Sequence, residues 1–273
     1  MTFKYLGTAA SEGYPAVFCD CDFCNAARAA GERRSRSQAL VNDELLVDLP
    51  PDTYAHALTY GLRLGRVKYL LITHSHGDHF YPNELTQRGG CFATRLQAPT
   101  LTVLASSGIV KAVQTEVAAY PPAAAGYAYV TAQAYTPVTL GDYTVVPLPA
   151  RHMDGAYIYA ITHGGKTLLY GNDTGYFYEE VFDYIKTAGL QFDMLSLDCT
   201  MCDNPVPDTG THMGYDTCRR TAERLKDIGA LKKDCRVCIT HFSHNGNPSR
   251  ANTDRRAKDI GATAAFDGME IEI

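Results

Sequence analysis

The sequence predicts an α/β fold whose strands end at candidate metal ligands. Five short apolar runs, rich in β-branched and aromatic residues, have the length of strands rather than helices. The runs are 67–72, 143–148, 166–170, 192–197 and 235–240, and they lead in turn to His74, His152, Asp173, Asp198 and His241. Because strand ends hold side chains more rigidly than one long loop would, this repeated placement indicates a sheet whose loops converge on one site.

Two segments between these strands show helical spacing. The segment 106–120 is predicted to be a helix that the prolines at 121–122 terminate. Asp216 is predicted to cap a second helix, which runs through Ala230. The stretch 118–126 is the segment most like a linker, but ligand-bearing strands lie on both sides of it. We therefore expect one domain spanning residues 1–273.

Composition and charge exclude several classes of protein. The formal net charge of −5 gives no general attraction to nucleic acid or to an anionic membrane surface. The arginines at positions 28, 33, 34 and 36 form the one basic cluster, which we interpret as a solvated loop. No apolar stretch approaches the roughly 20 residues of a membrane span, and no signal peptide is visible. We expect a cytoplasmic protein whose nine cysteines are reduced thiols rather than a disulfide framework.

The most informative motif is a cluster of strong metal ligands directly after the first apolar run. Its members are His74, His76, Asp78 and His79. Imidazole and carboxylate groups together suit zinc, manganese or iron. No helix or strand directs all four side chains to one side, so we expect a loop around a metal centre. The alternative is a solvated polar turn, but nine histidines in 273 residues rarely cluster this tightly by chance.

A second candidate metal motif lies near the N-terminus, within a cysteine-rich loop of residues 7–37. Its tightly spaced thiols are Cys19, Cys21 and Cys24. Three thiolates need a fourth ligand to complete a tetrahedral zinc site. His244, three residues beyond His241, is the leading candidate, and Cys235 or Cys238 are alternatives. Such a structural zinc would hold the N-terminal loop against the loop that bears His241. The competing interpretation is three free cysteines.

The histidine cluster, the aspartate after Gly-Asn and the final Thr-His resemble the metallo-β-lactamase superfamily from Gly7 to His244. The resemblance implies a four-layer αββα sandwich with two metal ions at one edge. It implies that His74, His76 and His152 hold the first metal, that Asp78, His79 and His241 hold the second, and that Asp173 bridges both.

The cysteine triad resembles the PhnP-type phosphodiesterases within that superfamily. The resemblance implies hydrolysis of a phosphodiester, and specifically of a small cyclic phosphate, by a hydroxide held between two divalent ions. The ions would be zinc or manganese, with iron as an alternative, beside one structural zinc. The catalytic residues would be the ligand Asp78 and a general acid, His212, while Asp48 would orient a histidine ligand. His212 and Asp48 each have a simpler interpretation, as a surface histidine and a turn aspartate respectively.

The expected partner is a small phosphodiester, with nucleic acid disfavoured and a homodimer left open because related enzymes are often dimers. Ribonuclease Z carries a similar motif, but the acidic balance, the absence of an obvious basic arm and the cysteine triad argue against it. Thioester or lactam hydrolysis would use the same ligands and stays open. Two alternatives of another class are a di-iron redox protein, disfavoured by His76, and a non-hydrolytic relative resembling PqqB.

Overall fold

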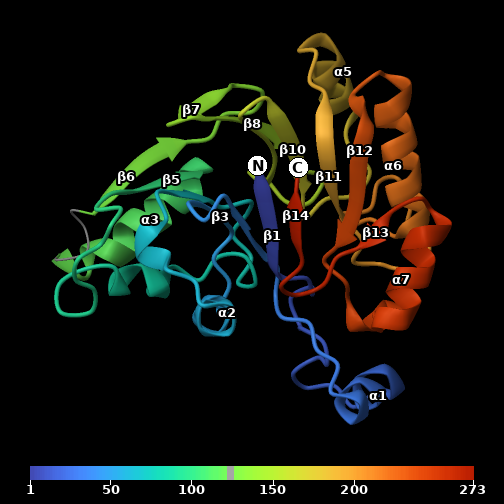
Figure 1. Ribbon diagram of the computed structural model, residues 1–273, viewed down its shortest axis with the longest axis horizontal. Coiled ribbons are helices and arrows are strands. Elements are labelled where there is room, and N and C mark those ends of the chain that lie inside the picture. The colour runs from blue at the N-terminus through green and yellow to red at the C-terminus, as the bar shows by residue number, and fades with distance from the viewer. Residues whose placement is uncertain (122–125) are drawn as a thin grey trace.

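Two mixed seven-stranded β-sheets pack face to face in the computed structural model, which describes residues 1–121 and 126–273 (Figure 1). The first sheet has the order β14 (Glu270–Glu272), β1 (Thr2–Gly7), β2 (Gln38–Val41), β3 (Leu45–Val47), β4 (Tyr69–Leu71), β5 (Leu101–Ala105) and β6 (Tyr127–Thr131). The second has the order β13 (Thr263–Ala264), β12 (Leu231–Thr240), β11 (Phe192–Asp198), β10 (Lys166–Gly171), β9 (Tyr157–His163), β8 (Tyr143–Pro149) and β7 (Val138–Leu140).

Helices cover the outer face of each sheet (Figure 1). On the side of the first sheet lie α2 (Thr53–Tyr60), α3 (Ser107–Ala118) and the short 3-10 turns η1 (Leu64–Arg66) and η2 (Pro82–Gln87). On the side of the second lie α5 (Glu179–Thr187), α6 (Tyr215–Asp227) and α7 (Arg250–Asp259), and the 3-10 turn η3 (His244–Gly246) follows β12. Helix α1 (Asp22–Ala30) stands apart from both layers on the N-terminal loop. This arrangement confirms the predicted four-layer αββα sandwich.

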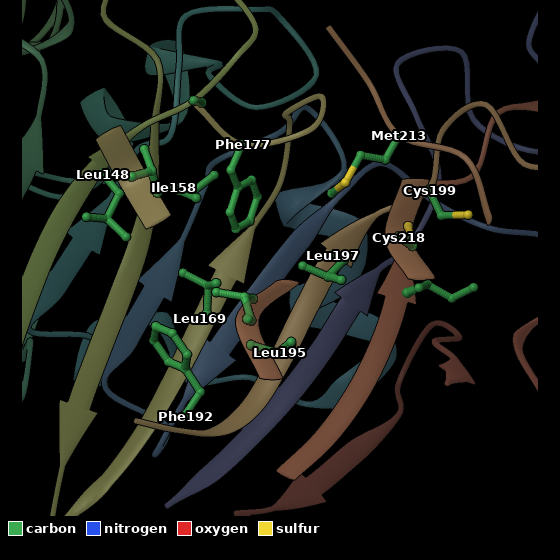
Figure 2. Packing of buried hydrophobic residues seen from close by; sticks show 14 of the residues in the cluster. Leu148, Ile158, Leu169, Phe177, Phe192, Leu195, Leu197, Cys199, Met213 and Cys218 are labelled. Carbon is green, nitrogen blue, oxygen red and sulfur yellow. The ribbon is translucent and has the colours of Figure 1, made fainter. Parts of the chain in front are cut away.

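Alternation of side chains explains why helices must cover the second sheet. In β10, Leu168 belongs to the apolar cluster between the sheets, whereas Leu169 belongs to the cluster beneath the helices. Met194 and Leu195 divide in the same way in β11. Figure 2 shows the outer cluster, in which Leu169 and Leu195 lie near the aromatic ring of Phe192. Because both faces of these strands are apolar, burial of both faces stabilises the layered arrangement.

Parallel strands bring the predicted ligands to one edge of the sandwich. Strands β3, β4 and β5 run parallel in the first sheet, as do β10, β11, β12 and β13 in the second. Strand β8 is antiparallel to β9, which is antiparallel to β10, so β8 and β10 end on the same side. The loops that follow these strands therefore meet, as the positions of the ligands in the sequence predicted.

Several local predictions need correction. The first predicted strand is shorter, because only Tyr69–Leu71 pair with neighbours, and the last one is longer, beginning at Leu231. Asp216 does not cap its helix: Gly214 takes the N-cap position, and Asp216 lies in the first turn, where it pairs with Arg219. The helix also ends earlier, at Asp227. The linker-like stretch includes residues 122–125, which lie outside the described residues.

The interpretation of the basic cluster as a solvated loop is wrong for Arg34, which is only 5% exposed. Its guanidinium donates to the carbonyls of Pro248 and Ala265 and to the hydroxyls of Thr8 and Thr253. A buried arginine is stable only when its donors are satisfied in this way. Arg34 therefore joins the N-terminal loop to the C-terminal segments. None of the helices in the described part of the chain combines the length and apolarity of a membrane span.

Candidate metal centre

Seven predicted ligands come together at the shared edge of the two sheets, in two groups. The first group is His74, His76 and His152. The Nδ1 atom of His76 lies 3.0 Å from Nε2 of His74 and 3.0 Å from Nε2 of His152. Burial lowers the pKa of His74 to about 2, with the charge of His79 as the next cause. A neutral imidazole at His74 keeps a lone pair available for coordination.

The second group is Asp78, His79, Asp173 and His241, and all four side chains are buried. The Nε2 atoms of His79 and His241 are 3.1 Å apart. Asp173 Oδ1 lies 3.3 Å from Nε2 of His79 and 3.1 Å from Nε2 of His241. The other carboxylate oxygen of Asp173 lies 3.8 Å from Nε2 of His74 and 4.0 Å from Nε2 of His152. Asp173 therefore presents one oxygen to each group.

Hydrogen bonds from the Nδ1 atoms of both histidines in the second group orient their rings. His79 donates from Nδ1 to Asp48 Oδ2 at 2.7 Å, so Nε2 is the nitrogen directed at the other members of the group. The Thr200 hydroxyl donates to Asp198 Oδ1 at 2.7 Å and must therefore accept from Nδ1 of His241, also at 2.7 Å. Nε2 of His241 is then the nitrogen that faces Nε2 of His79 at the centre of the group.

A divalent cation fits this arrangement. Asp173 Oδ1 is buried and has no hydrogen-bond partner, which is costly for a carboxylate oxygen. Burial alone would lower the pKa of His79, but Asp173 and Asp48 outweigh it and raise that pKa well above its ordinary value. The negative charges of Asp173 and Asp48 therefore favour a positive charge at this point. Imidazole nitrogens and carboxylate oxygens are the ligand types that zinc, manganese and iron accept.

Asp48 lies at the end of β3 and contacts the second group through Nδ1 of His79. Its buried carboxylate accepts from the backbone N–H and the hydroxyl of Thr73, at 2.8 and 2.9 Å, as well as from His79. The two bonds from Thr73 fix the Asp48 carboxylate, which in turn holds the ring of His79 in one orientation. Two other histidines lie outside the cluster: His56 is buried against Gln38 and Ser35, and His163 packs on a tyrosine ring.

Asp198, one of the candidate ligands that the sequence places at a strand end, belongs to the site through hydrogen bonds to its neighbours. Its Oδ2 atom accepts from Nδ1 of His212 at 2.7 Å and from the backbone N–H of Thr174 at 3.0 Å. Its Oδ1 atom binds Thr200, which in turn holds His241. Asp198 follows a strand just as Asp173 does, and this shared placement was the available signal.

His212 lies beside both groups, on a loop that passes close to the Asp173 loop. Its ring centroid is 4.8 Å from that of His152, and the side chain is 22% exposed. Burial lowers the pKa of His212, but the Asp198 carboxylate outweighs it and raises that pKa to about 9. Gly175 permits the close approach of this loop, because a Cβ atom there would collide with the carbonyl of Gly210.

The cysteine motif forms a separate cluster at the base of α1, with its ligand atoms within 4.8 Å of one another. The structure brings His244, and neither Cys235 nor Cys238, to the three thiols. Nδ1 of His244 lies 3.6 Å from the Sγ atoms of both Cys21 and Cys24. The backbone N–H of Cys24, followed by His244, lowers the pKa of Cys21 to about 6. A thiolate at Cys21 suits a tetrahedral zinc site of three cysteines and one histidine.

Residues 44–242 match the family described as Beta-lactamase superfamily domain. The chain belongs to the metallo-β-lactamase superfamily. A comparison of the sequence with curated proteins finds no match.

Three solved structures share the superfamily fold over nearly the whole chain. Zinc-bound PqqB from Methylobacterium extorquens is 20% identical with a TM-score of 0.75, and the match covers 100% of both chains. A diphosphatase from the PhnP family is 20% identical with a TM-score of 0.72, covering 100% of this chain and 97% of that one. The protein YhfI from Bacillus subtilis is 20% identical with a TM-score of 0.71, covering 100% and 99%. At these identities the likeness shows the fold alone.

Proposed function

We propose that this protein is a dinuclear metal-dependent phosphodiesterase that hydrolyses a small cyclic phosphate, such as a cyclic ribose phosphate or a 2′,3′-cyclic nucleotide. The observation that carries the proposal is the pair of donor groups joined by Asp173, whose two oxygens face different groups. His74, His76 and His152 would hold one ion, and Asp78, His79 and His241 the other. When bound, two such ions lower the pKa of a water molecule and offset charge on a phosphoryl oxygen.

The protein's own residues would supply orientation and a proton. Asp48 holds His79, and Asp198 holds His241 through Thr200, so neither imidazole can rotate freely. His212 is the proposed general acid for the leaving alkoxide. Asp198 accepts from its Nδ1 atom, which leaves Nε2 as the nitrogen that can transfer a proton.

Two features favour a small phosphodiester substrate. The net charge of −5 and the absence of a basic arm in the described residues disfavour docking of a large polyanion. A structural relative is a diphosphatase of the PhnP family, and the cysteine cluster with His244 is the feature on which the resemblance to that family rests. We propose that this cluster holds a structural zinc.

The competing function is a non-hydrolytic one, because PqqB is also a structural relative. The two proposals differ in whether the metal-loaded protein turns over a phosphodiester. The retention of all seven donors in two adjacent groups favours catalysis.

Metal analysis combined with a phosphodiester screen tests the proposed function. We expect the purified protein to hold about three metal ions per chain, two at the edge of the sandwich and one at the cysteine cluster. We also expect turnover of bis(p-nitrophenyl) phosphate that disappears on chelation and returns with zinc or manganese. About two ions per chain, or no turnover with any metal, would contradict the proposal.

Replacement of His212 by alanine is expected to affect substrates according to their leaving groups. An alkoxide leaving group needs a proton, so turnover of an alkyl diester should fall about 10²-fold. A p-nitrophenolate leaving group is stable without a proton, and its release should slow by less than about tenfold. His163→Ala, a change outside the cluster, is the control. Equal losses for both substrates would exclude His212 as the acid.

A further inference from the structure

A cavity of about 450 Å³ lies beside the metal centre, on the side of α3. Residues from three segments line it, including Ser75, Phe80, Ile109, Ala112, Asp154 and Gly155. This volume is within the range of pockets that bind small molecules. None of the seven clustered donors lines the cavity, so it is a separate space.

The cavity adjoins the metal centre through the backbone. Ser75 stands between His74 and His76 in the sequence, Phe80 directly follows His79, and Asp154 lies two residues after His152. Helix α3 follows β5, which is the parallel neighbour of β4, so α3 begins at the edge where His74 lies. The cavity is therefore lined by residues that lie one or two positions from four of the candidate ligands, His74, His76, His79 and His152.

Most of the exposed wall of the cavity is apolar, and its polar part includes the hydroxyls of Ser75, Ser106 and Ser107. Phe80 and Ile109 are buried, at 9% and 3% exposure, and Ala112 packs at the edge of the same apolar cluster. The described residues that line the cavity include one charged side chain, Asp154, and no lysine or arginine. An apolar ring placed here would be removed from water, whereas a second anionic group would meet the Asp154 carboxylate as well as the serine hydroxyls at the start of α3.

We propose that this cavity binds an uncharged, largely apolar ester group of the substrate, of the size of an aromatic ring or nucleobase. The inference rests on the proposed function, because it takes the phosphoryl group to bind at the metal centre. It favours a phosphodiester with a nucleoside-like group over one with a second phosphate at this position.

Calorimetric titration of the metal-loaded protein with simple phosphate monoesters tests the cavity without requiring turnover. Phenyl phosphate is expected to bind at least about tenfold more tightly than methyl phosphate, because its ring is buried in the cavity. Phenyl phosphate should also bind more tightly than 4-carboxyphenyl phosphate, whose additional charge faces Asp154.

Three variants identify the surface responsible. Ala112→Phe fills the cavity and should bring the ratio of phenyl to methyl phosphate affinity close to one. Gln114→Phe places the same ring on the same helix, at an exposed position outside the cavity lining, and should keep the wild-type ratio. Asp154→Asn should narrow the difference between phenyl and 4-carboxyphenyl phosphate.

The outcomes separate this inference from the proposed function. Equal wild-type affinity for phenyl and methyl phosphate, or a preference that survives in Ala112→Phe, would overturn the inference. If only Ala112→Phe loses the preference for phenyl over methyl phosphate and the protein turns over no diester, the result would support ring binding in the cavity. It would contradict the proposed phosphodiesterase activity. Binding of neither monoester would contradict both.

Discussion

Replacing Asp78 with alanine is expected to abolish turnover of bis(p-nitrophenyl) phosphate, with a loss of more than about 10³-fold. Asp78 Oδ2 lies 3.3 Å from Nε2 of His79 and 3.7 Å from Nε2 of His241, so its carboxylate belongs to the second donor group. Loss of this ligand leaves two imidazoles and the shared Asp173 for one ion. Without that ion, the remaining ion would lack a second positive charge beside it to hold the attacking water and to offset charge on the phosphoryl oxygen.

Metal content and a matched variant make the Asp78 prediction specific. Asp78→Ala should lose one ion of about three, while the ion at the cysteine cluster stays bound. The control is Asp142→Ala, which removes an exposed carboxylate from the turn before β8, whereas His152 follows the other end of that strand. This variant should keep the wild-type metal content and rate. Full activity in Asp78→Ala would show that the second donor group is not part of a catalytic centre.

Replacing Cys21 with serine is expected to release one metal ion and to lower Tm by about 5–10 °C. The cluster joins the N-terminal loop to the segment after β12, and it adds to the hydrogen bonds that Arg34 and other residues make between the same parts of the chain. Glu12 accepts from Ser243 and from the backbone N–H of His244, at 2.6 and 3.1 Å, and Phe242 pairs with the chain near Ala9. Structural metal binding contributes directly to folding free energy, so loss of one thiolate removes that contribution.

Cys91→Ser is the control for the cysteine cluster, because Cys91 is exposed and lies outside every candidate metal group. It should keep the wild-type Tm and metal content. Calorimetry and metal analysis on both variants separate a site effect from a general effect of losing a thiol. An unchanged metal count in Cys21→Ser would mean that the cluster holds no ion.

The local pattern of the sequence predicted the strands well and the ends of elements less well. The runs before His152, Asp173 and Asp198 are strands at nearly the predicted positions, because alternation and β-branching act within a few residues. The start of this helix was predicted two residues late, with the cap at Asp216 instead of Gly214. Gly214 occupies the cap because a Cβ atom there would meet the carbonyl of Cys202, a contact made by tertiary packing.

Long-range contacts account for what was missed. Asp198 ends a strand in the sequence, but its bonds to His212 and Thr200 depend on how the loop after β11 folds back. Arg34 lies in a run of charged residues, yet partners more than 200 positions away bury it. Neither set of contacts has a signature in the local pattern, because one depends on the path of a loop and the other on residues far apart in the chain.

The sequence by itself determined the ligand types, their spacing and their positions at strand ends, since each of these is a property of short segments. Tertiary structure alone decided that His244, rather than Cys235 or Cys238, joins the three thiols, how Asp198 holds His212 and His241, and where a cavity lies beside the metal centre. The physical reason is that coordination, burial and hydrogen bonding depend on distances between atoms. Those distances follow from the packing of two sheets and their helices, which no short segment specifies.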